Sequence, residues 1–214
     1  GHGGSWGIMK ANFETALNRL GKALEYNPNN AAAHSTLGIL YSRLGQPDKA
    51  EKHYAEAVRT APDDSGALNN YGQFLCSQGR HAEALALFDR AVANPLYRTP
   101  AVAQTNAGTC ALEAGDPATA ETRLRAALQS DPKFAPALMQ MARVSFDKAE
   151  HLSARAYLQR YLEVAKPTAA SLWLGVRIER ALGNTDGASS HALALRSRFP
   201  DSEETRLLNE SGPQ

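Results

Sequence analysis

Small and large apolar residues alternate along this chain in a pattern that recurs about every 34 residues. Each period begins with a Gly, continues twelve residues later with an Ala and four residues further with a large apolar side chain, and then gives a second Ala. The members are Gly38, Ala50, Tyr54 and Ala57; Gly72, Ala84, Phe88 and Ala91; Gly108, Ala120, Leu124 and Ala127. Short turn signals such as Gly45-Gln46 and Gly79-Arg80 divide each period, so every period predicts two antiparallel helices.

This order of residues resembles the tetratricopeptide repeat (TPR). It predicts an all-α fold, a TPR solenoid of antiparallel helix pairs in a right-handed superhelix. We expect about five full repeats, an N-terminal half repeat and a C-terminal capping helix in a single array over residues 6–210. The predicted boundaries are 6–30 (partial), 31–64, 65–100, 101–134, 135–167, 168–201 and the cap at 202–210. Residues 1–5 are interpreted as a tag scar and excluded from the fold.

The small residues have a packing role. Gly38 and Gly72 are predicted to lie where a neighbouring helix crosses, because a side chain there would push two backbones apart. Ala50, Ala84 and Ala120 are expected to be buried at the same crossings. In the half repeat, Asn12 is expected to mark the turn before a single helix that ends near Pro28.

Composition narrows the functional classes. The chain carries 23 basic and 22 acidic residues, a net charge of +1, without a basic block that would favour nucleic acid. No apolar run is long enough for a membrane span. Cys76 and Cys110 are 34 residues apart, nearly one repeat. A disulfide between them is conceivable, but two buried small apolar side chains are favoured.

Catalytic and metal-binding patterns are missing from the sequence. The six His do not pair with one another or with Cys at ligand spacing, and each is interpreted as part of a solvated helix face. Phosphate loops, dinucleotide glycines and nucleophile motifs are also absent. We therefore expect no enzymatic activity, no cofactor and no bound metal.

The remaining candidates face the inner groove, which the first helix of each repeat lines. The predicted protein-binding residues are Ser35, Ile39, Arg43, Asn69, Asn70, Gln73, Thr105, Asn106, Thr109, Met139 and Arg143. Asn70 and Asn106 occupy the same position in successive repeats, and an amide both donates and accepts, so the pair suits an extended peptide backbone. Ile39 and Met139 are expected to supply apolar contacts. The Lys pattern that clamps an acidic peptide C-terminus is missing from the repeats over 31–134.

A second candidate surface is the loop from Pro95 to Pro100, where the repeat is two residues longer. Leu96 and Tyr97 would form a binding site if they project outward. The alternative, that both fold back onto the core, is favoured.

Several longer sequence segments resemble those of one protein family. Leu68-Asn69-Asn70-Tyr71-Gly72-Gln73-Phe74-Leu75 is followed by Pro95-Leu96-Tyr97-Arg98 in the lengthened repeat. Later come Ser171-Leu172-Trp173-Leu174-Gly175-Val176-Arg177-Ile178 and Phe199-Pro200-Asp201-Ser202. In this order, across about residues 12–210, they resemble the type IV pilus biogenesis lipoproteins of the PilF/PilW family.

The resemblance implies a pilotin: a monomeric lipoprotein at the periplasmic face of the bacterial outer membrane. Such a protein helps the pilus secretin reach that membrane and assemble there. The implied anchor is an acylated N-terminal Cys, and no signal peptide or lipobox Cys precedes Trp6 in this chain. Two alternatives stay open: a TPR scaffold of another envelope or secretion complex, and a regulatory TPR module of a larger enzyme.

Overall fold

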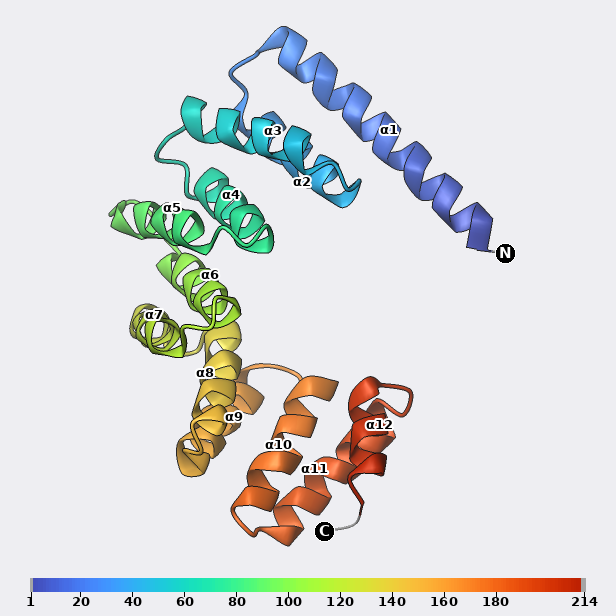
Figure 1. The fold of residues 1–214 in the computed structure, drawn as a ribbon, viewed down its shortest axis with the longest axis vertical. Helices are drawn as coiled ribbons and strands as arrows, with labels where there is room; N and C mark the ends of the chain where they lie inside the picture. Colours follow the sequence, from blue (N-terminus) through green and yellow to red (C-terminus); the bar gives the residue numbers. More distant parts are fainter. Residues whose placement is uncertain (1, 213–214) are drawn as a thin grey trace. The chain divides into compact units, whose positions relative to one another are not determined.

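The computed structural model describes residues 2–212, and within that range it contains twelve α-helices and no strands (Figure 1). This confirms the all-α prediction. Contacts divide the chain into two compact units, Gly1–Gly115 and Asp116–Gln214. The division falls inside the predicted repeat 101–134, so the single array over 6–210 remains a prediction. None of the described helices combines the length and apolar character needed to cross a membrane.

The N-terminal unit consists of six helices. They are α1 (His2–Tyr26), α2 (Ala31–Arg43), α3 (Pro47–Thr60), α4 (Ser65–Ser77), α5 (His81–Ala93) and α6 (Pro100–Glu113). The contacting pairs α2–α3 and α4–α5 lie within the predicted repeats 31–64 and 65–100. The first helices α2, α4 and α6 also contact one another in sequence order. A core of aromatic and small side chains, including Tyr54, Phe74 and Phe88, fills the space between them.

The C-terminal unit contains the other six helices. They are α7 (Pro117–Ser130), α8 (Ala135–Asp147), α9 (His151–Val164), α10 (Ala169–Ala181), α11 (Thr185–Arg198) and α12 (Glu203–Glu210). The contacting pairs α8–α9 and α10–α11 lie within the predicted repeats 135–167 and 168–201. Ala188 and Leu195 on α11 are buried in the core of this unit.

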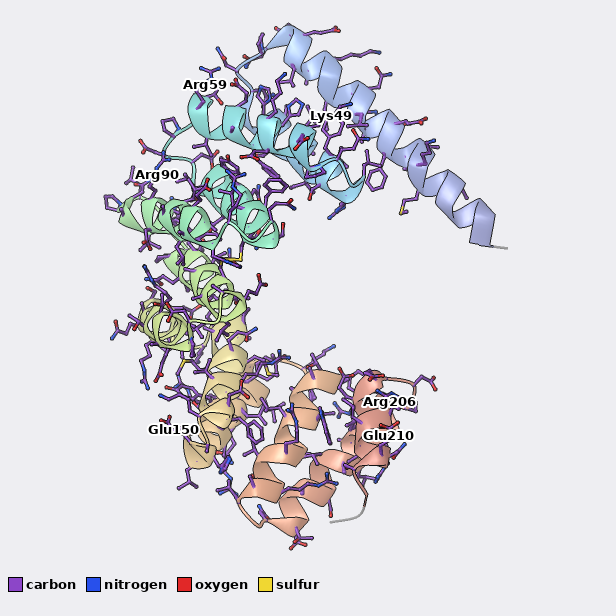
Figure 2. The ribbon with its side chains drawn as sticks, viewed as in Figure 1. Lys49, Arg59, Arg90, Glu150, Arg206 and Glu210 are labelled. Atoms are coloured by element: carbon purple, nitrogen blue, oxygen red, sulfur yellow. A yellow bond between two sulfur atoms is a disulfide. The ribbon has the colours of Figure 1, made fainter. Side chains whose placement is uncertain are left out.

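The capping helix is confirmed at α12. It begins after Ser202, whose hydroxyl accepts a hydrogen bond from the Thr205 backbone N–H at 3.1 Å. Leu208 is buried against α10 and α11, while Arg206 pairs with Glu210 one turn later on the exposed side (Figure 2). The helix therefore covers the apolar end of the C-terminal unit with a polar outer face.

The helix crossings match the predicted register. A Cβ on Gly38 would lie 2.7 Å from the Tyr54 ring, and one on Gly72 would lie 2.6 Å from the Phe88 ring, so neither position has room for a side chain. Ala50, Ala84 and Ala120 are each 0% exposed. The small residues are therefore required by close approach between helices, as the sequence indicates.

The second helices also anchor the turn before their own repeat. Arg90 on α5 donates to the Pro62 carbonyl at 3.1 Å, and Arg160 on α9 donates to the Pro132 carbonyl at 2.9 Å (Figure 2 labels Arg90). Both arginines occupy the same place in their repeats, 28 residues after the proline. The bond satisfies a carbonyl just beyond a helix end, where no intrahelical donor exists.

The prediction for the N-terminal segment is wrong in one respect. A turn is expected at Asn12, but α1 runs without interruption from His2 to Tyr26. Turns within the repeats contain a Gly with positive φ, such as Gly45 at 71° and Gly79 at 79°. Asn12 has no Gly beside it, and Asn inside a helix costs less than about 0.7 kcal/mol, so the helix continues. The tag assignment for residues 1–5 stays a prediction, and Gly1 lies outside the described residues.

Candidate protein-binding surfaces

Polar side chains on α4 and α6 form a connected network in the N-terminal unit. The Gln73 amide donates to Asn106 Oδ1 at 3.3 Å, and the Asn106 amide lies 3.5 Å from Asn69 Oδ1. The Asn69 amide in turn donates to the Tyr97 hydroxyl at 3.0 Å. Asn69 and Gln73 are one helical turn apart on α4, so both point toward the same side of α6. The network extends from buried Asn69 to exposed Gln73.

Beside this network lies a hollow of about 230 Å³. Its lining residues are Gln73, Cys76, Ser77, Phe88, Asn106, Thr109, Cys110 and Glu113. Three of the predicted binding residues, Gln73, Asn106 and Thr109, are therefore brought together. Amide and hydroxyl groups at the edge of a hollow are suited to hold a peptide backbone by both donating and accepting hydrogen bonds.

Two of the residues that line the hollow, Cys76 and Cys110, differ from the prediction. Cys76 and Cys110 form a disulfide that joins α4 to α6, with Cα atoms 5.8 Å apart. The predicted burial is right, but the predicted pair of separate thiols is wrong. Small residues on α6, including Ala103 and Ala107, let the two helices approach within disulfide range.

The other predicted groove residues differ in their exposure. Ser35 and Thr105 are buried, at 9% and 5% exposure, and Ile39 packs against the core. The reason is that α4 contacts both α2 and α6, so positions expected to face a groove lie at helix contacts. Arg43 is exposed at the end of α2, and Asn70 is half-buried. Asn106 bonds Asn69 and Gln73 rather than its repeat equivalent Asn70.

The two apolar residues of the long loop point in different directions, so each of the two predicted outcomes holds for one of them. Tyr97 folds back, packs on the core and accepts the hydrogen bond from Asn69. Leu96 projects outward with 84% of its surface exposed. The Asn94 side chain explains the loop shape, because its oxygen accepts from the Leu96 N–H at 3.0 Å and its amide donates to the Asp63 carbonyl at 3.2 Å. One of the two apolar side chains of the loop is thus exposed.

Met139 and Arg143 lie on α8 in the C-terminal unit. Met139 is half-buried against the core of that unit, while Arg143 is exposed. The Arg177 guanidinium on α10 lies over the rings of Phe146 and Trp173, at 5.4 Å and 5.3 Å from their centroids. Trp173 and Arg177 lie within the segment Ser171–Ile178 and are not among the binding residues predicted from the sequence. Their four-residue spacing on one helix face is the signal that identifies this cluster.

The histidines are not all solvated, contrary to the prediction. His34 is buried, its Nδ1 lies 3.1 Å from His53 Nδ1, and its Nε2 lies 2.9 Å from the Pro28 carbonyl. A neutral His34 therefore donates from Nε2 to the carbonyl and accepts from His53 at Nδ1. The His53 ring also stacks on Tyr41 at 5.5 Å. Burial, followed by the nearby His34, lowers the pKa of His53 below its ordinary value of 6.5.

One group of potential metal ligands occurs where the sequence suggests none. Cys76, His81 and Glu113 place ligand atoms within 4.8 Å of one another. The sulfur of Cys76 is held in the disulfide, so it has no hydrogen to donate and is not a thiolate ligand. The 3.1 Å approach of Glu113 Oε2 to that sulfur is therefore a contact rather than a hydrogen bond. We assign no metal to this group.

Comparisons with known protein families identify the general class to which the chain belongs. Three tetratricopeptide repeat family models match residues 4–63, 35–97 and 111–173. Together with the helix pairs and their small-residue crossings, these matches make the chain a TPR protein. A 30% identity to cellulose synthase operon protein C of Xanthomonas axonopodis pv. citri (strain 306) covers 78% of this chain but only 11% of that protein.

Matches over nearly the whole chain define the family. The crystal structure of PilW, a widely conserved type IV pilus biogenesis factor, is similar with a TM-score of 0.82 and 33% identity, covering 94% of this chain and 92% of PilW. The structure of Pseudomonas aeruginosa PilF has a TM-score of 0.81, 28% identity and coverages of 96% and 92%. The type IV pilus assembly protein PilF of P. aeruginosa PAO1 is 29% identical over 92% of this chain and 78% of its own length. The chain belongs to the PilF/PilW family of type IV pilus biogenesis proteins.

Proposed function

We propose that this chain is a pilotin, a non-catalytic protein that binds the type IV pilus secretin and assists its outer-membrane localisation and assembly. The observation that carries the proposal is the match to PilW, which covers more than nine-tenths of both chains at 33% identity. A shared TPR fold alone would not distinguish this role from other scaffolds, since one fold supports many functions. Similarity along nearly the entire length to pilus biogenesis factors favours this family's task.

The chemistry of the described residues supports a binding role. Shifted pKa values belong to groups engaged in packing or ion pairs. Burial alone would raise the pKa of Glu179, but hydrogen bonds from Arg155 and Asn184 outweigh it, and the pKa is lowered. Arg80 is likewise paired with Glu51 and Glu83 at 2.7 Å. These groups stabilise helix contacts and do not converge on the 230 Å³ hollow, as acid and base catalysts would.

The surface we propose for secretin binding is the α4–α6 network around Gln73 and Asn106. It combines the exposed Gln73 amide and the half-buried Asn106 amide with a hollow lined in part by the disulfide, so the groups are held in place before a partner arrives. Leu96 provides a separate apolar contact. The amides would set the register of an extended partner segment, and buried apolar anchors would supply most of the affinity.

We further propose that the native protein works as a monomer at the periplasmic face of the outer membrane, held there by a lipid anchor. Its resemblance to the pilus lipoproteins supports this location. The Cys76–Cys110 disulfide is consistent with it, because disulfides persist in oxidising compartments such as the periplasm.

The experiment is deletion of the gene in its bacterial host, followed by fractionation of the membranes and quantification of the secretin. We expect the secretin to decrease in the outer-membrane fraction and its assembled ring to disappear, with both restored by the wild-type gene. Normal secretin amounts and assembly in the deletion strain would reject the pilotin role. That outcome would favour the alternative of a TPR scaffold for a different envelope complex.

A further inference from the structure

A cationic and aromatic cluster on α8 and α10 is separate from the network proposed above. These helices contact each other within the C-terminal unit. The Arg177 guanidinium of α10 lies over the rings of Phe146 and Trp173, and the charge of Arg143 on α8 is close enough to affect it. We call these four residues the arginine–aromatic cluster.

The guanidinium of Arg177 is partly removed from water and forms no ion pair with a carboxylate of the described residues. Among the described residues its one hydrogen bond runs from Nε to the Trp173 carbonyl at 3.5 Å, which is long. Among the described residues, no carboxylate forms an ion pair with Arg177 or Arg143. Burial, followed by the charge of Arg143, lowers the pKa of Arg177, and Asp147 opposes this only in part. The cluster therefore has an excess of positive charge in a half-desolvated place.

Two other arginines of the same unit show how a structural guanidinium is satisfied. Arg155 makes a bidentate pair with Glu179, with its shortest contact at 2.6 Å. Arg160 lies over the Tyr157 ring at 5.6 Å, which resembles Arg177, but it also donates to the Pro132 carbonyl at 2.9 Å. Arg177 differs because its terminal nitrogens have no such acceptor among the described residues. A purely structural role for Arg177 does not explain why its charge has no paired acceptor.

We propose that the arginine–aromatic cluster binds a carboxylate carried by a segment of the protein partner. Arg177 and Arg143 would pair with the carboxylate, since guanidinium groups hold carboxylates through two parallel hydrogen bonds. Phe146 and Trp173 keep the Arg177 plane oriented and offer apolar surface to the neighbouring side chain of the segment. This inference rests on the proposed protein-binding function and names the chemistry that the partner must present.

The proposal differs from the acidic-peptide clamp considered from the sequence. That clamp requires Lys on the first helices of the repeats over 31–134, where Ser, Asn and Thr stand instead. The cluster uses arginines on the first helices of the next two repeats. The exclusion of a carboxylate ligand therefore applies to the N-terminal unit and not to this surface.

The test uses Trp173 as its own reporter. The chain has two Trp residues, so Trp6→Phe leaves Trp173 as the only indole. The probes are the peptide acetyl-Ala-Glu-Phe-Glu-Ala-amide and the same peptide with Gln in place of Glu, titrated into the millimolar range. We expect the Glu peptide to change Trp173 fluorescence in a saturable way, weakened by added salt, and the Gln peptide to bind at least about tenfold more weakly.

Three variants separate the proposal from a structural role. Arg177→Gln and the exposed Arg143→Gln should each weaken the Glu peptide several-fold or more. Arg160→Gln is the matched control, because this arginine also lies over an aromatic ring, and it should leave binding unchanged. Arg143→Gln keeps the test valid if Arg177→Gln fails to fold, as judged by circular dichroism. Equal binding of both peptides, no saturable binding of either, or unchanged binding by Arg143→Gln would overturn the proposal.

A secretin pull-down with the same proteins distinguishes this inference from the proposed function. Capture of secretin by the wild type but not by the Arg143→Gln Arg177→Gln double variant supports both. Equal capture by wild type and double variant overturns the carboxylate inference and leaves the pilotin role standing. No capture by the wild type, together with specific binding of the Glu peptide, rejects the secretin as partner and supports the carboxylate site.

Discussion

At the scale of single residues, side-chain volume decides how closely the two helices of a repeat approach. Ala84 on α5 is 0% exposed, and Gly72 on the facing helix has a Phe88 ring carbon 2.6 Å from where a Cβ would be. Interiors packed at this density have little space for additional atoms. A change of a few methylene groups at these positions is therefore expected to alter stability measurably.

Ala84→Leu tests this packing. The larger side chain should lower the free energy of unfolding by about 1–3 kcal/mol through overpacking. Ala82→Leu is the control, because Ala82 lies on the same helix and is exposed. Urea denaturation followed by circular dichroism measures both. Equal midpoints for Ala84→Leu and the wild type would show that the repeat register is wrong.

The His34–His53 pair predicts a pH dependence of stability. Because the pKa of His53 is lowered in the folded protein, the unfolded chain binds more protons as the pH falls below about 6.5. Neutral His53 therefore makes its whole contribution to the free energy of unfolding above this pH. The contribution is lost as the pH falls toward the lower pKa of the folded state. Burial also lowers the pKa of His191 in the folded protein. The stability of the C-terminal unit should therefore also decrease as the pH falls.

The measurement is the urea midpoint between about pH 7.5 and 5.5, where carboxylates with ordinary or lowered pKa values stay ionised. The midpoint of the wild type should fall across this range. The midpoint of His53→Gln should fall less, because this variant lacks the imidazole whose pKa is lowered by folding. An identical decline in wild type and His53→Gln would show that the His34–His53 pair does not couple folding to pH.

At the scale of helices, the disulfide between α4 and α6 connects neighbouring repeats. It closes a loop with a sequence separation of 34 residues. The chain-entropy model assigns about 3–4 kcal/mol to such a loop, because the cross-link restricts the unfolded chain. Reduction is therefore expected to destabilise the N-terminal unit and to loosen the hollow beside Gln73 and Asn106.

The disulfide prediction is tested by thermal melts with and without a thiol reductant. The wild type should lose several degrees of melting temperature on reduction, while Cys76→Ser Cys110→Ser should melt low in both conditions. Thiol titration after reduction should find two free thiols per chain. A melting temperature of the wild type that does not respond to complete reduction contradicts the expected contribution.

The helices themselves were largely predictable, and the failures have local causes. The Gly and Ala positions give the register directly, because only small residues fit the crossings of α2–α3 and α4–α5. The missed continuity of α1 arises from treating Asn12 as a turn residue although the true turns use a Gly with positive φ. Ala149, at φ 60°, shows the opposite case, since it takes this conformation after α8 without a Gly. Turn position in that repeat follows from the helix pair around it rather than from the local residue.

At the scale of the whole molecule, the binding residues were predicted less completely than the fold. Repeat position identifies Gln73, Asn106 and Thr109 as lining residues, but it also selects Ser35 and Thr105, which are buried. Position in a repeat fixes the direction of a side chain without fixing what the neighbouring helix covers. Arg177 was missed because its character depends on Phe146, which belongs to another repeat.

The oxidised protein is expected to contain no stoichiometric transition metal. With Cys76 held in the disulfide, His81 and Glu113 provide two ligands, fewer than the three or four protein ligands typical of zinc sites. Elemental analysis of dialysed protein measures this directly. One equivalent of zinc per chain retained with the disulfide intact would contradict the assignment.

The central claim is that the chain acts by binding the secretin through the α4–α6 surface. The most direct measurement is the affinity of the purified secretin for the wild type, for Gln73→Ala Asn106→Ala and for Leu96→Ala, with melting temperatures taken in parallel. We predict that the amide pair weakens binding by about tenfold or more, from two lost hydrogen bonds of roughly 1 kcal/mol each, while the melting temperature stays nearly unchanged. Abolished binding by Leu96→Ala together with unaltered binding by the amide variant would contradict the account and move the binding surface to the loop.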